Sequence, residues 1–224
     1  MSQLRVVFDL DDTLYPERSF AISAFGAASR WAKATLGVDG LEADMTRLLD
    51  AGHLGQLFPM VLEQRGIDRV HAAGLLDAYR THAPAHLALY SDAAEVLHLL
   101  AALGPMGLIT DGTVSVQQAK VRALGLARTF QEIIYTHGLG GREFAKPHPS
   151  AFEAMQASIG KAGDRFVYVG DNPAKDFVSP NQMGWQTVQI ERPQRIHANA
   201  ETAAGGKAQH VITTLADLPG ILGI

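Results

Sequence analysis

The chain contains no cysteine among its 224 residues. Disulfide bonds, metal sites built on thiolates and a cysteine nucleophile are therefore excluded. The absence of cysteine is compatible with a reducing compartment, and we expect a cytoplasmic protein.

The sequence also has no excess of positive charge. Its 19 Lys and Arg residues are outnumbered by 23 Asp and Glu residues, which gives a net charge of −4 at pH 7. Proteins that bind nucleic acid generally need basic patches that displace counterions from the phosphate backbone. We therefore predict no nucleic-acid partner, and nothing in the composition indicates an oligomeric state.

Long apolar runs are missing as well. The longest apolar stretch, residues 96–109, is interrupted by His98, Gly104, Pro105 and Gly107, whereas a membrane-spanning helix needs roughly 20 apolar residues. The amino-terminal sequence MSQLRVVFDLDD ends its short apolar run in acids rather than in a small-residue cleavage site. We expect neither a membrane span nor an export signal.

Short runs of β-branched, apolar and aromatic residues recur along the chain and predict six strands. Most of them are separated by segments with helical spacing, an alternation typical of an α/β protein with a parallel sheet covered on both faces. The predicted strands are residues 5–8, 106–109, 132–135, 166–169, 187–190 and 210–212, and the predicted helices between them are residues 93–103, 115–124, 149–159 and 174–183.

One interval, residues 16–87, contains only helical patterns, and we predict a helical insert that divides the α/β core into residues 1–15 and 88–224. Because the insert follows the first strand, it should lie at the carboxyl end of the sheet, where open α/β folds bind ligands, and act as a lid. Residues 191–209 show no clear period, and we expect an irregular surface excursion there. The helical patterns of the insert cover residues 20–36, 41–50, 56–64 and 72–80.

The strongest chemical signal is the acidic sequence DLDDT, which directly follows the first predicted strand. Side chains two apart in an extended chain share a side, so Asp9 and Asp11 can point to one position beyond the strand end. Their repulsion there requires a shared proton or a cation, and a hard divalent ion with oxygen ligands is such a cation. The alternative is a polar turn or a helix cap without catalytic chemistry.

A second acidic sequence, GDNPAKD, occupies residues 170–176 and follows another predicted strand. If the two strands are neighbours in a parallel sheet, Asp171 lies beside Asp9 and Asp11, and this oxygen-rich pocket suits Mg²⁺. Asp176 would then support the site from one turn away. The alternative for Asp176 is a charge that faces the macrodipole at a helix N-terminus.

Two weaker signals lie between the acidic sequences. LITDG ends a predicted strand with Thr110, Asp111 and Gly112, and AKPHP holds Lys146 extended before a proline. A threonine hydroxyl and the backbone N–H groups of a glycine turn can bind phosphate oxygens, and a lysine ammonium can neutralise them. We predict that these four residues bind substrate. The alternatives are a helix cap for Thr110 and a solvated surface charge for Lys146.

In this order, the sequences DLDDT, LITDG, AKPHP and VGDNPAKD resemble the four motifs of the haloacid dehalogenase superfamily of phosphohydrolases. The resemblance implies a doubly wound, Rossmann-like parallel sheet with a helical cap between motifs one and two. It also implies a nucleophile and Mg²⁺ ligand at Asp9, an acid/base at Asp11 whose backbone carbonyl binds the metal, and a further carboxylate ligand at Asp171. Thr110 and Lys146 would hold the transferring phosphoryl group.

Three positions in these motifs bear on the comparison with the family. Many relatives have glycine where this chain has Asp12, and asparagine where it has Asp111, which adds a negative charge near the phosphate site. Asp11 separates the chain from the dehalogenases themselves, which lack an acid at that place and need no metal. The resemblance therefore implies phosphate-ester chemistry rather than carbon–halogen cleavage.

The predicted function is a Mg²⁺-dependent phosphatase that hydrolyses a small phosphorylated metabolite, a nucleoside monophosphate or a sugar phosphate, through an aspartyl phosphate on Asp9. The main alternative is a phosphomutase, which would use the same nucleophile and return the phosphoryl group to its product. A signalling domain or an inactive metal-binding protein fits less well, because a large helical insert follows the first acids and every residue required for turnover is present. Tyr15 and Arg18, at the start of the insert, are weaker candidates for contact with the leaving group.

Overall fold

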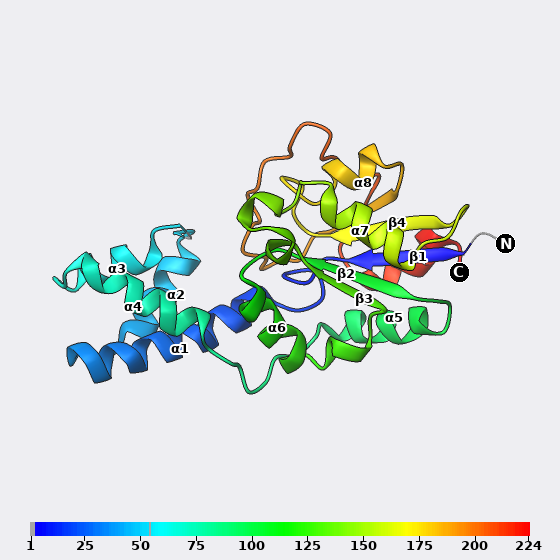
Figure 1. Ribbon diagram of the computed structural model, residues 1–224. Coiled ribbons are helices and arrows are strands. Elements are labelled where there is room, and N and C mark those ends of the chain that lie inside the picture. Colours follow the sequence, from blue (N-terminus) through cyan, green and yellow to red (C-terminus); the bar gives the residue numbers. More distant parts are fainter. Residues whose placement is uncertain (1–2, 54) are drawn as a thin grey trace. The chain divides into compact units, whose positions relative to one another are not determined.

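The computed structural model describes residues 3–53 and 55–224, which form two compact units (Figure 1). The core unit joins the segment that ends at Glu17 to Leu87–Ile224, and the helical unit is Arg18–His86. In the described ranges, no helix is both long enough and apolar enough to cross a membrane.

The core unit is built on one six-stranded sheet in which all neighbouring strands run parallel. The predicted α/β class with a doubly wound parallel sheet is thereby confirmed. The inner strands are almost fully buried because their apolar side chains alternate between two covered faces. The order across the sheet is β3-β2-β1-β4-β5-β6, with β1 at Leu4–Phe8, β2 at Met106–Thr110, β3 at Glu132–Tyr135, β4 at Arg165–Gly170, β5 at Gln186–Ile190 and β6 at His210–Ile212.

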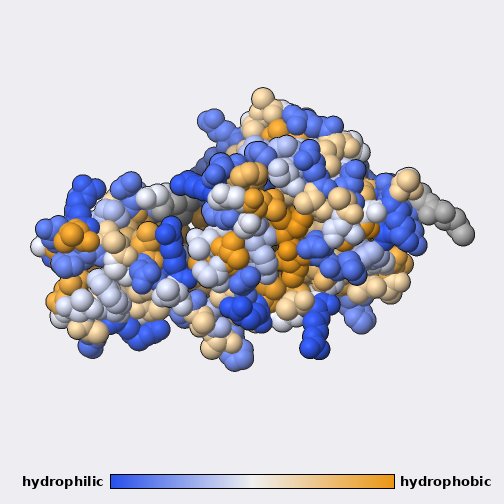
Figure 2. Space-filling view, in the orientation of Figure 1, coloured by the Kyte–Doolittle hydropathy of each residue, from blue (hydrophilic) through white to orange (hydrophobic). Residues whose placement is uncertain are grey.

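Helices cover both faces of this sheet, with α7 and α8 on one side and α5 and α6 on the other (Figure 1). On the α7 side, Val7, Ile109 and Tyr168 of three adjacent strands pack with Phe152 and Met155 into one hydrophobic cluster. The face of the molecule drawn in Figure 2 has apolar side chains set among hydrophilic ones. The core helices are α5 (Ser91–Ala101), α6 (Val114–Ala123), α7 (Ser150–Ile159), α8 (Val178–Gln182) and α9 (Leu218–Leu222).

Helix α8 is much shorter than the helix predicted over residues 174–183. Residues 172–176 form a turn closed by side chains: Asn172 Oδ1 accepts from the Ala174 N–H at 3.0 Å, and Asp176 Oδ2 accepts from the Asn172 N–H at 2.8 Å. Such local bonds favour a turn over a helix. The turn at residues 172–176 therefore holds its polar side chains at the end of β4.

The strand order places the ends of three motif-bearing strands side by side. The chain passes from β1 through β2 to β3 on one side, and then returns to β4 on the other side of β1. This reversal is the position where open α/β sheets bind ligands, outside the carboxyl ends of the strands. The candidate residues after β1, β2 and β4 therefore share one edge of the sheet.

The helical unit has its own aromatic core. Phe25, Phe58 and Tyr79 contact one another with ring centroids 5.6–6.4 Å apart, and Phe20 meets Tyr79 edge to face. Such ring pairs add to the stabilisation from buried area. The helices of the unit are α1 (Glu17–Leu36, whose first residue belongs to the core unit), α2 (Leu41–Asp50), α3 (Leu57–Gln64) and α4 (Ala72–Arg80).

The segment at residues 191–209 has no helix or strand and is mostly exposed, as the sequence predicts, but one buried side chain anchors it. Arg192 is buried and binds both oxygens of Asp92, at 2.7 and 3.0 Å, while its guanidinium lies 4.0 Å from the centre of the Tyr90 ring. It also donates to the backbone carbonyl of Thr13 at 3.2 Å. This contact could not be predicted from the sequence, because the segment is anchored by a single buried arginine and has no repeating apolar pattern.

We predict that Asp92→Asn destabilises the core unit by about 1–3 kcal/mol at neutral pH, because Arg192 would be left without its charged partner. Burial alone raises the pKa of Asp92, but hydrogen bonds from Arg192, Leu215 and Thr214 lower it below its usual value. A lowered pKa contributes stability above the usual carboxyl range, and this contribution disappears as pH falls through the folded-state pKa. The difference in urea-unfolding free energy between wild type and variant should therefore shrink in acid.

The matched control is Glu95→Gln, an exposed position on the same helix, α5. It should leave the unfolding free energy within about 0.5 kcal/mol of wild type. Equal stability of Asp92→Asn and wild type at pH 7 would contradict the role assigned to this ion pair.

Candidate active site

Backbone pairing brings the first and fourth motifs together. The Asp9 N–H donates to the Val169 carbonyl at 2.8 Å, so the residue after β1 continues the ladder with β4. Asp171 follows β4 directly, after Gly170. A Cβ at Gly170 would lie 2.7 Å from Asp176 Oδ2, so a residue with a side chain cannot replace this glycine without moving the carboxylate.

Three buried carboxylates meet at this edge. Oxygens of Asp9, Asp171 and Asp176 lie within 4.8 Å of one another. Burial raises the pKa of Asp9 to about 7, and burial together with the charges of Asp176 and Asp9 raises the pKa of Asp171 well above its usual value. Asp176 Oδ1 is paired with Lys146 Nζ at 2.7 Å, whereas Asp171 Oδ2 has no hydrogen-bond partner among the described residues. A group of buried carboxylates with one unpartnered oxygen is a ligand set that suits a hard divalent cation.

The cluster differs in one member from the predicted set of Asp9, Asp11 and Asp171. Asp176 was predicted to support the site, yet its carboxylate belongs to the cluster itself. Asp11 is absent from the cluster because its side chain points to helix α6. The predicted contribution of Asp11 to the metal came from its backbone carbonyl and does not involve this side chain.

Three polar groups surround the Asp11 carboxylate. Tyr15 Oη and Lys120 Nζ donate to Oδ1 at 2.5 and 2.7 Å, and Gln117 Nε2 donates to Oδ2 at 2.9 Å. Burial raises the pKa of Asp11, but the charge of Lys120 and the three hydrogen bonds outweigh it and lower the pKa below its usual value. The side chain is therefore a carboxylate before substrate binds. Tyr15, a weak candidate for substrate contact, instead binds Asp11.

Gln117 and Lys120 were missed by reasoning from sequence. Both lie on α6 and are almost fully buried. Their spacing of three residues places them on the same helix face, next to apolar residues that should also face the sheet. A lysine on the buried side of an amphipathic helix needs an acidic partner. The position of Lys120 among apolar residues of the helix could therefore have indicated its role.

Lys146 is enclosed by oxygen atoms. Its Nζ donates to Asp9 Oδ1 at 2.5 Å and to Tyr168 Oη at 3.0 Å, and it forms an ion pair with Asp176 Oδ1 at 2.7 Å. Burial lowers the pKa of Lys146, but the charges of Asp176 and Asp9 outweigh it and raise the pKa well above its usual value. The side chain is 0% exposed, which excludes the alternative of a solvated surface charge.

The second motif forms the neighbouring wall. Thr110 is the last residue of β2 and accepts a hydrogen bond from Gln117, while Thr113 precedes α6, so Thr110 is not a helix cap. Gly112 has a φ of +126°, which side chains rarely permit. These positions form the expected turn between a strand and a helix.

Asp111, the residue that replaces asparagine in the family pattern, forms three contacts. Its Oδ1 accepts from Thr136 Oγ1 at 2.8 Å and from the Lys146 N–H at 3.0 Å, and its Oδ2 accepts from Lys175 Nζ at 2.9 Å. Burial raises the pKa of Asp111, but the charges of Lys146 and Lys175 outweigh it and lower the pKa to about 2. The extra negative charge is therefore paired with Lys175.

Asp12, which replaces a common glycine, has a φ of +54°. Its Oδ1 accepts from the Glu17 N–H at 2.9 Å and its Oδ2 from the Ile196 N–H at 2.6 Å. Glycine is favoured in this left-handed conformation, and aspartate tolerates it when its side chain bonds locally. Asp12 thereby fastens the segment at residues 191–209 to the loop of the first motif.

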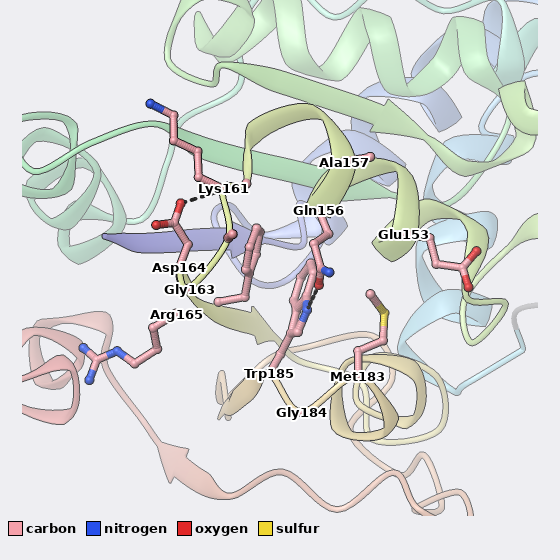
Figure 3. Close-up of a pocket in the computed structure, with 13 residues that line it drawn as sticks. Glu153, Gln156, Ala157, Lys161, Gly163, Asp164, Arg165, Met183, Gly184 and Trp185 are labelled. Carbon is pink, nitrogen blue, oxygen red and sulfur yellow. Dashed lines mark hydrogen bonds between the residues drawn. The ribbon is translucent and has the colours of Figure 1, made fainter. Parts of the chain in front are cut away.

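Some of these residues, together with Glu17 and His197, line a cavity of about 80 Å³ in the core unit. A second cavity, of about 760 Å³, opens near the start of β4 beside Trp185, Gln156 and Lys161 (Figure 3). It contains none of the predicted site residues, so the acidic cavity is the candidate active site. The residues that line this acidic cavity are Asp9, Asp11, Glu17, Asp111, Asp171, Lys175 and His197.

Comparison with known proteins indicates the same family that the four sequence motifs resemble. The model of the haloacid dehalogenase-like hydrolases matches residues 5–184. A glyceraldehyde 3-phosphate phosphatase from Methanopyrus kandleri is 31% identical over 84% of this chain and 83% of its own length. A ribulose-1,5-bisphosphate 5-phosphatase from Halopiger xanaduensis is 29% identical over 97% of this chain and 98% of its own.

A solved structure supports the fold. The HAD-hydrolase YfnB of Bacillus subtilis covers all of both chains with a TM-score of 0.68 at 19% identity, a likeness that concerns the fold alone. The family model spans most of this chain and includes every predicted site residue. The chain is therefore an enzyme that belongs to the haloacid dehalogenase-like hydrolases.

Proposed function

We propose that the protein is a Mg²⁺-dependent phosphatase that hydrolyses a small sugar phosphate through an aspartyl phosphate on Asp9. The observation that carries the proposal is the buried group of Asp9, Asp171 and Asp176 with Lys146 against it. Curated relatives at 29–31% identity that act on glyceraldehyde 3-phosphate and ribulose 1,5-bisphosphate favour a sugar phosphate over a nucleoside monophosphate.

Asp9, Asp171 and Asp176 are the side chains that would hold the magnesium ion, and the backbone carbonyl of Asp11 remains its predicted further ligand. When bound, the ion supplies positive charge against the acids and the phosphate oxygens. Asp171 has a buried oxygen without a hydrogen-bond partner among the described residues, which fits this role.

Asp9 is the proposed nucleophile. Lys146 binds its Oδ1, and Thr13 donates to its Oδ2 at 3.3 Å, so both oxygens are held in place. A carboxylate oxygen of Asp9 attacks phosphorus in line, the bond to the ester oxygen breaks, and an aspartyl phosphate forms. Water then attacks the phosphorus of this intermediate, which releases inorganic phosphate and restores Asp9.

Asp11 is the proposed acid and base. It gives a proton to the departing alkoxide and later takes one from the attacking water. Its pKa is low before substrate binds, because Lys120, Tyr15 and Gln117 stabilise the carboxylate. A phosphate dianion in the cavity raises this pKa by repulsion, so protonation of Asp11 accompanies binding of the substrate.

The helical unit at Arg18–His86 is proposed to be the cap that excludes bulk water during the reaction. This assignment follows from the position of the insert between the first and second motifs. The alternative predicted from the sequence, a phosphomutase, would give a different product. A phosphatase releases inorganic phosphate, whereas a mutase transfers the phosphoryl group to a hydroxyl group of its product.

We predict that Mg²⁺ raises the thermal midpoint of wild type but not of Asp171→Asn. When the free Mg²⁺ concentration is 100 times the dissociation constant, binding at one site adds about 2.7 kcal/mol to the free energy of unfolding. Without Mg²⁺, the variant should be at least as stable as wild type, because one buried negative charge is removed. Calorimetric titration with Mg²⁺ checks the binding directly.

Asp217→Asn is the matched control, since Asp217 is exposed and lies in the same unit. It should respond to Mg²⁺ as wild type does. An unchanged Mg²⁺ affinity in Asp171→Asn would exclude this carboxylate as a ligand.

We predict that Asp9→Asn has no turnover above background with p-nitrophenyl phosphate. Asp11→Asn should lose about 10²- to 10⁴-fold in turnover of alkyl phosphates, because the leaving alkoxide needs a proton. It should still form the phosphoenzyme from the activated aryl ester. Rapid-quench mass spectrometry measures the phosphoenzyme, and comparable turnover by wild type and Asp9→Asn would end the assignment of the nucleophile.

We predict that a panel of phosphate monoesters will show a higher kcat/KM for triose and pentose phosphates than for nucleoside monophosphates. Release of inorganic phosphate is the measurement, with Mg²⁺ present and then chelated. Isomerised sugar phosphate without phosphate release would identify a mutase instead. A preference for nucleoside monophosphates would overturn the proposed substrate class but keep the chemistry.

A further inference from the structure

The family resemblance assigns phosphate binding to Lys146, whose ammonium already has three oxygen neighbours in this structure. Asp9, Tyr168 and Asp176 place three oxygens within 3.0 Å of Nζ, and the side chain is 0% exposed. An ammonium has three N–H donors. A phosphate oxygen could reach Lys146 only by displacing one of these oxygens.

Lys120 is engaged in a similar way. Its Nζ lies 2.7 Å from Asp11 and 3.7 Å from Glu17, and the side chain is 4% exposed. Both lysines therefore neutralise acids behind the cavity wall. The substrate brings two negative charges into a cavity lined by five carboxyl side chains, and an accessible side-chain cation would reduce this repulsion further than the proposed magnesium ion alone.

Among the described residues that line the cavity, Lys175 is the only lysine or arginine. Its side chain is 30% exposed, and its single acceptor in the described part of the chain is Asp111 Oδ2 at 2.9 Å. Two N–H donors of the ammonium are thus available to a ligand. Exposure, donor count and position together distinguish Lys175 from the other two lysines.

The position of Lys175 is fixed from two sides. Its backbone N–H donates to the Asn172 carbonyl at 3.2 Å within the turn that carries Asp171 and Asp176. Its ammonium is held by Asp111, which is itself fixed by Thr136 and the Lys146 N–H. A cation held in advance binds an anion without losing much side-chain entropy.

We infer that Lys175, positioned by Asp111, binds the phosphate oxygens of the substrate in addition to Lys146 and the proposed magnesium ion. The inference rests on the proposed phosphatase function and adds a substrate-binding residue to it. It also gives a role to Asp111, which orients Lys175 in place of the asparagine of the family pattern.

The test compares Lys175→Met and Lys175→Arg with wild type in the presence of Mg²⁺. Binding of inorganic phosphate is measured by calorimetry, and KM and kcat are measured with p-nitrophenyl phosphate. Loss of a charge-assisted hydrogen bond should weaken phosphate binding and raise KM by about 10- to 100-fold in Lys175→Met, with a smaller change in kcat. Lys175→Arg should recover part of the loss.

Asp111→Asn tests the positioning role. It should raise KM and weaken phosphate binding less than Lys175→Met does, and the double variant should resemble Lys175→Met alone. Lys161→Met, at an exposed lysine of the core unit, is the control and should match wild type. Thermal midpoints identify any variant whose fold is damaged.

Phosphate binding by Lys175→Met that equals wild type would overturn the inference, as would an absence of phosphate binding by wild type itself. Phosphate binding that depends on Lys175 in a protein without turnover would support the inference and refute the phosphatase function. Turnover with an unchanged KM in Lys175→Met would support the phosphatase function and refute the inference about Lys175.

Discussion

The ammonium of Lys146 is the contact on which the rest of the site depends. It joins Asp9, which follows β1, to Asp176, which belongs to the turn after β4. Without a cation between them, two buried carboxylates from different parts of the chain would repel each other in a medium of low polarity. Desolvation disfavours the charge of Lys146, yet the two acids keep its pKa well above the usual value. The ion contacts thus fix the geometry of the nucleophile.

The remaining charges of the site are paired in the same manner. Asp11 has Lys120 and Asp111 has Lys175, and the pKa of each acid is lowered as a result. Asp171 Oδ2 has no hydrogen-bond partner in the described part of the chain, and the pKa of Asp171 is raised by burial and by the neighbouring acids. A divalent ion at this position would stabilise the charged form of the carboxylate.

Much of the fold could be predicted from the sequence, because apolar runs of strand length and helical spacing are local signals. All six predicted strands are present, and β3 and β6 have the predicted bounds. Local polar bonds were harder to foresee: Asn172 and Asp176 form a turn where a helix was predicted, and Arg192 buries part of an aperiodic segment. The turn and the buried arginine depend on single side chains and not on a periodic pattern of apolar residues.

The candidate residues after β1, β2 and β4 could be named because acids at strand ends are visible in the chain, and parallel strands bring them to one edge. The residues that contact these acids could not be named from the sequence. Lys120 and Gln117 come from the buried face of α6, and Tyr168 lies within an apolar strand where its hydroxyl gives no signal. Lys175 was adjacent to Asp176 in the sequence, but only its ion pair with Asp111 shows that it faces the cavity.

Asp12 and Arg192 attach residues 191–209 to the loop of the first motif, and His197 from this segment reaches the cavity. The family match ends at residue 184, before the segment begins. Part of the wall around the reacting groups is therefore contributed by sequence that the shared motifs do not specify. A substitution in this segment would therefore change the wall of the cavity without changing any of the motif residues.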